Sequence, residues 1–107
     1  MKTLKLKLKE IKESHKAEKK YDAVFLTPDG KEKLVPFGQK GYNDFILFNE
    51  KEGAKVANMH KERYLNRHRK NEHWNKPDTP GALSRFILWN KKTVRASLRD
   101  YKKRFGV

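Results

Sequence analysis

The sequence predicts an α+β fold: a small single domain with an extended N-terminal arm, a β-hairpin or small antiparallel sheet, and about three C-terminal helices. Three observations lead to this prediction. Apolar residues alternate with lysines near the N-terminus, a Pro-Asp-Gly turn separates two β-rich runs, and the second half of the chain shows helical apolar spacing behind typical helix caps. A length of 107 residues suits one domain with a small core.

Residues 1–20 are predicted to form an extended basic arm, separate from a compact domain over residues 21–107. A period of two between apolar residues is typical of an amphipathic strand, and a lysine-rich strand at a terminus suits either a sheet edge or a segment that pairs with a partner. Residues 12–20 are nearly all polar, so we expect a tether there. The candidate partner-binding residues of the arm are Leu4, Leu6, Leu8 and Ile11.

The hairpin is expected between residues 21 and 37. Its two β-rich runs, 21–26 and 34–37, flank Pro28, Asp29 and Gly30. Proline presets the backbone for a turn, and glycine supplies the positive φ that the turn needs. A further short apolar run, 44–48, is expected to be a strand.

Three helices are expected after residue 53. The first covers residues 54–69 and follows a break that ends at Gly53. The second begins with Thr79 as N-cap and Pro80 in the first turn, and the third begins with Thr93 as N-cap. The apolar stripe of the third helix consists of Val94, Leu98, Tyr101 and Phe105.

The net charge of +14 is concentrated in the second half of the chain. Residues 1–53 carry twelve lysines and nine acids, whereas residues 54–107 carry fifteen lysines and arginines and four acids, and all seven arginines lie there. Arginine is suited to bidentate recognition of phosphate and carboxylate. We therefore expect the two basic helices to bind anions or nucleic acid through Lys61, Arg63, Arg67, Arg69, Lys70, Arg95, Arg99, Lys102, Lys103 and Arg104.

Aromatic residues within the basic segment 61–75 leave two interpretations open. Tyr64 and Trp74 could stack on unpaired bases while arginines hold the backbone. Both positions also suit core residues, because Tyr64 falls on the apolar face of its helix and Trp74 adjoins a proline-containing loop. We favour the core interpretation.

Metal binding and catalysis are not favoured by the sequence. His60, His68 and His73 match neither the H-E-x-x-H pattern nor a Cys/His zinc finger, and the loose HNH-like set around His68 lacks a hairpin close enough to frame it. Carboxylates do not converge with a nucleophile and a base. We expect no enzymatic activity, no cofactor and no small-molecule substrate.

Cysteine is absent, which excludes disulfides and thiolate metal sites and favours a reducing compartment. No stretch approaches 18 consecutive apolar residues, so no transmembrane segment is expected, and the lysine-leucine alternation at the start does not suit a signal peptide.

Five segments between residues 21 and 105 resemble a family of small uncharacterised basic proteins of nucleocytoplasmic large DNA viruses. They read YDAVF, VPFGQKGYNDF, KERYLNRHRKNEHWN, TPGALSRFILWNK and SLRDYKKRF. The resemblance implies a protein made in the cytoplasm or nucleus of a eukaryotic host and located in the virion.

Two functions are expected from the resemblance and the charge together. The first is a structural, cement-like minor capsid protein whose arm binds neighbouring capsid or other virion proteins and whose basic helices bind anionic surfaces. The alternative is a DNA-binding protein without sequence specificity that packages or condenses the viral genome.

Overall fold

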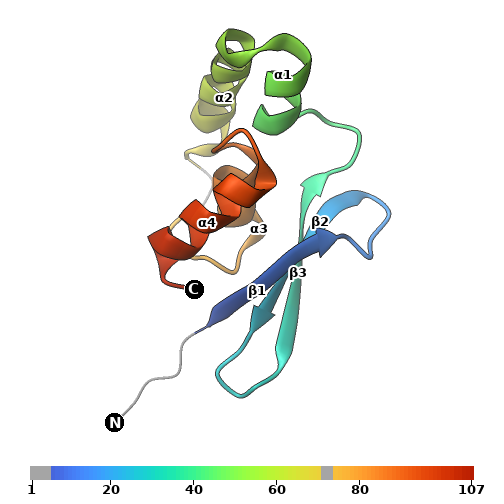
Figure 1. Cartoon of the computed structure of the whole chain (residues 1–107), viewed down its shortest axis with the longest axis vertical. Helices are drawn as coiled ribbons and strands as arrows, with labels where there is room; N and C mark the ends of the chain where they lie inside the picture. The colour runs from blue at the N-terminus through green and yellow to red at the C-terminus, as the bar shows by residue number, and fades with distance from the viewer. Residues whose placement is uncertain (1–5, 71–73) are drawn as a thin grey trace.

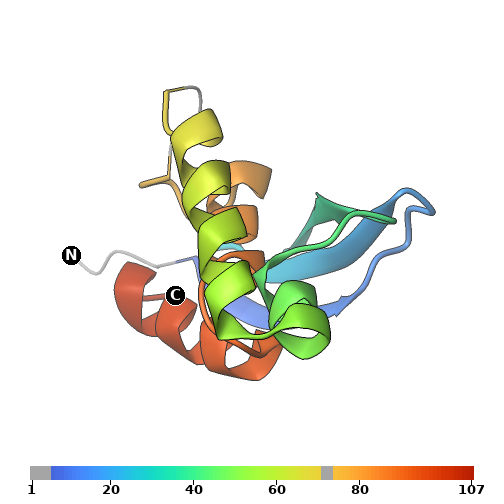
Figure 2. The same ribbon diagram turned by 90° about the horizontal axis from the view of Figure 1, so that it is seen from above.

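The structure is a computed structural model that describes residues 6–70 and 74–107. It confirms the α+β prediction: a three-stranded antiparallel sheet precedes the helices, which gather on one side of it (Figures 1 and 2). In chain order the elements are β1 (Lys7–Glu13), β2 (Lys19–Leu26), β3 (Glu32–Gln39), α1 (Phe45–Glu52), α2 (Ala54–His68), α3 (Pro80–Leu83), a π-helix η1 (Ser84–Leu88) and α4 (Val94–Phe105).

The sheet is a meander in which β2 lies between β1 and β3. Side chains alternate between its two faces, so Tyr21, Ala23 and Phe25 of β2 share one face. Their cross-strand partners include Phe37, Val35 and Leu8. This face carries the sheet's contribution to the hydrophobic core.

The helices complete the core from the opposite side. Leu83, Ile87 and Tyr101 are fully buried, and they join the sheet residues in one hydrophobic cluster. The predicted stripe of the last helix is confirmed, because Val94, Leu98 and Phe105 pack against this cluster beside Tyr101. The Tyr101 hydroxyl donates to the carbonyl of Pro77, and burial raises the pKa of Tyr101 well above its usual range.

The prediction of a detached arm is wrong for residues 7–13. These residues form β1 and pair with β2, interrupted by a bulge after Leu8. Leu8 is 3% exposed, and Leu6 and Ile11 pack against the core. Burying these side chains stabilises the strand in its own sheet, so the sheet-edge interpretation holds. Leu4 lies outside the described residues.

The expected tether and domain boundary also need correction. Lys12 and Glu13 complete β1, and β2 already begins at Lys19. Residues 14–18 form the turn between them, where the amide of Lys19 donates to the carbonyl of Lys16 at 3.2 Å. The boundary placed after residue 20 therefore falls inside β2.

The strand expected at residues 44–48 is wrong, because the chain forms α1 from Phe45. Asp44 is its N-cap: its carboxylate accepts a hydrogen bond from the amide of Leu47 at 3.0 Å. A short apolar run suits either element, and the capping aspartate decides in favour of the helix.

The expected hairpin and helix starts are confirmed. The amide of Thr27 donates to the carbonyl of Lys31 at 2.8 Å across the turn, where Gly30 has φ of 85°. The hydroxyl oxygens of Thr79 and Thr93 accept hydrogen bonds from backbone amides three residues later.

The π-helix η1 continues α3 and packs closely against the end of β3. At Gly38, φ is +77° and a Cβ atom would lie 2.7 Å from Cδ1 of Leu88. Only glycine combines this backbone conformation with so close an approach. Gly38 therefore allows the Leu88 side chain to lie close to the end of β3.

We expect Gly38→Ala to destabilise the protein more than Gly30→Ala. Both glycines have positive φ, which costs an L-residue about 1–2 kcal/mol, but a Cβ atom at Gly30 meets open space. Overpacking against Leu88 adds about 1–3 kcal/mol to the effect at Gly38. Urea denaturation of the two variants and the native protein measures the difference. Equal losses would show that the sheet and η1 can move apart freely.

Candidate functional site

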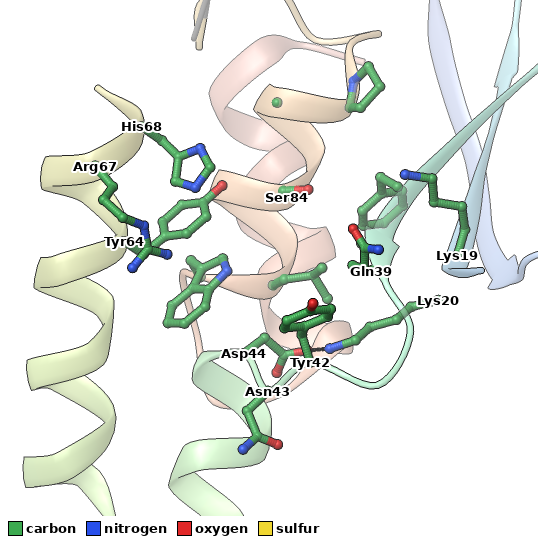
Figure 3. A pocket seen from close by; sticks show the side chains of 16 residues that line it. Lys19, Lys20, Gln39, Tyr42, Asn43, Asp44, Tyr64, Arg67, His68 and Ser84 are labelled. Atoms are coloured by element: carbon green, nitrogen blue, oxygen red, sulfur yellow. Dashed lines mark hydrogen bonds and ion pairs between the residues drawn. The ribbon is translucent and has the colours of Figure 1, made fainter. Parts of the chain in front are cut away.

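A groove opens where the start of β2 and the end of β3 face α2 and the α3–η1 helix (Figure 3). Its main cavity has a volume of about 500 Å³, and a second cavity of about 500 Å³ adjoins it. The two cavities share four lining residues, and together we call them the groove. The shared residues are Tyr42, Asn43, Arg67 and Trp89.

One wall of the groove is built from stacked aromatic rings. Trp89 stacks on Tyr64 with ring centroids 4.6 Å apart and planes 9° apart, and Tyr64 stacks in turn on His68 at 4.4 Å. The ring centre of Phe48 lies 6.3 Å from that of Trp89, and Phe48 stacks on His60 at 3.8 Å. The i, i+4 spacing of the three α2 residues places them on one helix face. The wall therefore combines rings from α1, α2 and the residue that follows η1.

Tyr42 stands at the rim, in the loop that follows β3. Tyr42 is 67% exposed, although its side chain offers a large apolar surface. Figure 3 shows its ring beside the Lys20–Asp44 pair. An exposed aromatic ring at the mouth of a cavity is available to stack on a planar ligand.

Cations line the groove from both sides. Arg63 and Arg67 lie one turn apart on α2 and are exposed, and Lys19 faces them from β2 (Figure 3 shows Arg67 and Lys19). None of the three forms an ion pair with another described residue. Their charges are therefore available to an anionic ligand.

Asp44 is the one acidic residue among the described residues that line the two cavities, and its charge is compensated. One carboxylate oxygen caps α1, and the other accepts a hydrogen bond from Nζ of Lys20 at 2.6 Å. Both side chains of this pair are largely buried, at 13% exposed for Lys20 and 6% for Asp44. The pair ties the sheet to α1 and leaves the groove with a positive net charge.

The predicted anion-binding residues of α2 divide between the groove and the protein interior. Arg63 and Arg67 line the groove, and Arg69 and Lys70 are exposed at the end of the helix. Lys61 instead donates to the carbonyl of Asn90 at 3.2 Å and lies 4.9 Å from the ring centre of Phe45. Burial, with the nearby charges of Arg85 and Lys91, lowers the pKa of Lys61. It serves to join α2 to the chain after η1.

The predicted residues of α4 are brought together on another face of the molecule. Arg95, Arg99, Lys102 and Lys103 are exposed there. Arg104 points elsewhere: its guanidinium lies 4.5 Å from the ring centre of Phe86 and 3.5 Å from the carboxylate of Asp100. Arg104 is therefore engaged within the fold, unlike the other four residues.

Several groove residues were missed by sequence reasoning. Tyr42, Phe48, Trp89 and Lys19 come from four separate segments, and only the fold brings them together. The sequence did contain one signal for the aromatic wall of the groove: the spacing of His60, Tyr64 and His68 places three rings on one helix face. The favoured core interpretation of Tyr64 agrees with its 6% exposure and with its stacking on Trp89 and His68, although the residue also lines the cavity. Trp74 is half-buried under the guanidinium of Arg85.

The histidines do not assemble a metal site in the part of the chain that the structure describes. No three His, Asp or Glu side chains there lie close enough together to hold a metal ion. His60 and His68 instead stack on aromatic rings, while His73 lies outside the described residues.

Ser14, His15 and Asp22 have the residue types of a hydrolase triad but a different arrangement. Ser14 Oγ donates to Asp22 at 2.6 Å, and His15 binds the same carboxylate through Nδ1 and through its backbone amide at 3.0 Å. In a triad the serine would bind the histidine instead. Burial opposes ionisation of Asp22, but these hydrogen bonds outweigh it and lower its pKa. The cluster closes the β1–β2 turn.

The Asp22 cluster predicts a stability difference that depends on pH. Because the folded pKa lies below the unfolded value of about 3.9, ionised Asp22 stabilises the fold above about pH 4, and this contribution is lost as the pH falls through the folded pKa. We expect Ser14→Ala to be less stable than the native protein at pH 6 and the difference to shrink at pH 2. Urea denaturation at both values measures it.

Carbon-13 NMR titration of the Asp22 carboxyl provides the control for that experiment. Its midpoint should lie below the ordinary value in the native protein and rise in Ser14→Ala. An unchanged midpoint, or an equal stability loss at both pH values, would contradict the assigned role of the hydrogen bonds.

Comparison with known proteins yields one similarity. Residues 9–52 match a family of unknown function (DUF5754). The matched segment runs from within β1 to the end of α1, so it includes Lys19, Tyr42 and Phe48 but not the groove residues of α2 and Trp89. No curated protein and no solved structure matches the chain. None of the helices formed by the described residues is long and apolar enough to span a membrane.

Proposed function

We propose that the protein binds single-stranded nucleic acid without sequence preference. The groove would hold the strand, with a base stacked on Tyr42 and phosphates held by Arg63, Arg67 and Lys19. The observation that carries this proposal is the exposed Tyr42 ring at the mouth of a cationic groove. Proteins that bind single strands combine aromatic platforms with a positive groove in this way.

The size and charge of the groove support a single strand as its ligand. A cavity of about 500 Å³ lies within the range of sites that hold small organic groups, and so can accept a base with its sugar. In a duplex the bases are stacked inside and cannot reach Tyr42. Every base has a π-face, so stacking favours no particular sequence.

The cement-like capsid role remains a prediction with less support from the chain. In that role a free N-terminal arm would add a strand to a neighbouring protein. In the structure, however, Leu8 and Ile11 are used in the protein's own sheet and core. The alternative expectation, a protein that packages or condenses the viral genome, shares with this proposal a nucleic-acid ligand but not the preference for a single strand. Fractionating virions into shell and nucleoid separates the two roles by the location of the protein.

Reversing the groove charges should weaken strand binding. We expect Arg63→Glu with Arg67→Glu to raise the Kd for a fluorescent 12-nucleotide DNA strand about tenfold or more at 0.1 M salt. Loss of two phosphate contacts should also reduce the slope of log K against log salt by about 1.4. Fluorescence anisotropy at several salt concentrations measures both quantities.

Lys31→Glu with Lys55→Glu is the matched control, because it changes the net charge equally at exposed positions outside the groove. If the control weakens binding as much as the groove variant, general charge attraction explains the affinity and the groove assignment fails.

The stacking contact can be tested separately from charge. Removing one base–aromatic contact costs about 1–3 kcal/mol, so Tyr42→Ala should raise the Kd for the strand about 5- to 150-fold. Tyr42→Phe keeps the ring and should bind within about twofold of the native protein. Binding of a blunt 12-base-pair duplex should be insensitive to both changes. Unchanged strand binding by Tyr42→Ala would remove the main support for the proposal.

A further inference from the structure

We infer that α4 carries a second phosphate-binding surface and that one molecule bridges two nucleic-acid segments. The inference rests on the proposed function for its first contact, the groove. The second surface consists of the exposed cations Arg95, Arg99, Lys102 and Lys103, which we call the α4 basic face.

The α4 basic face forms a row along the helix. Its members occupy positions i, i+4, i+7 and i+8, so they lie on one side of α4 over about 12 Å at a rise of 1.5 Å per residue. None of them forms an ion pair with another described residue. The nearest acid along the helix, Asp100, is engaged by the amide of Asn90 at 2.7 Å and by Arg104. The row is therefore an uncompensated line of positive charge.

The row and the groove lie on opposite sides of η1. Ser84 and Leu88 of η1 line the groove, whereas Phe86 faces α4, with its ring centre 5.5 Å from that of Phe105. Figure 3, which looks into the groove, shows the red ribbon of α4 behind η1. A short strand that occupies the groove therefore leaves the α4 basic face open to a second segment.

The chemistry of the row fits a phosphate backbone better than an acidic protein surface. Protein interfaces depend on buried aromatic and aliphatic anchors, but the apolar stripe of α4 faces the protein's own core. The solvent-exposed side of α4 carries spaced cations, which suit the regular charge of a nucleic-acid backbone. Because this face lacks an exposed ring, it should accept single strands and duplexes alike.

A two-stage capture experiment tests the bridge. A biotinylated 15-nucleotide strand on beads is loaded with protein and washed, and a fluorescent second strand or duplex is then added. We expect the native protein to retain both second probes. Arg95→Glu with Arg99→Glu should retain at least about tenfold less of either probe, while its Kd for one free 12-nucleotide strand changes less than about threefold.

The outcomes separate the bridge from the proposed function. If the native protein binds the free strand but retains no second probe, the bridge is wrong and the proposed function stands. If the α4 variant retains the second probe as well as the native protein does, some other contact links the segments and the inference is overturned. If the free strand is not bound at all, both proposals fail. Equal melting curves for the α4 variant and the native protein exclude unfolding as a cause.

Discussion

The contact between Leu88 and the backbone at Gly38 fixes how the helices lie on the sheet. A side chain at position 38 would clash with the end of the Leu88 side chain. Leu88 lines the groove together with Ser84 and Trp89, and Trp89 is the ring on which Tyr64 stacks. The close approach of one glycine to one leucine therefore sets both the core packing behind η1 and the shape of the groove in front of it.

Four of the five aspartates in this protein join different segments of the fold, whereas most of the cations on α2 and α4 are exposed. Asp22, Asp44, Asp78 and Asp100 each accept hydrogen bonds or ion pairs that join different segments. Hydrogen bonding from Lys33 lowers the pKa of Asp78, and hydrogen bonding from Asn90 lowers that of Asp100. All four carboxylates are thus occupied by contacts within the fold. The excess of positive charge accordingly reaches solvent on α2 and α4.

Local sequence signals predicted the elements whose geometry is decided locally. The Pro28–Gly30 turn and the capping threonines 79 and 93 hold their structure through hydrogen bonds within a few residues, so their patterns sufficed. The pairing partner of residues 7–13 could not be predicted, because a strand with lysines between leucines can pair within its own sheet or with another protein. The groove escaped prediction for a related reason. It exists only where β3, α2 and η1 meet, so no single segment of the sequence indicates it.

The meander order of the sheet has a consequence for how the chain folds. Each strand pairs with its neighbour in sequence across a short turn, and such local pairing closes small loops at little entropic cost. The core, by contrast, joins Leu8 near one end of the chain to Tyr101 near the other. The contacts between α4 and the sheet therefore close the longest loops of the chain and cost the most chain entropy on folding.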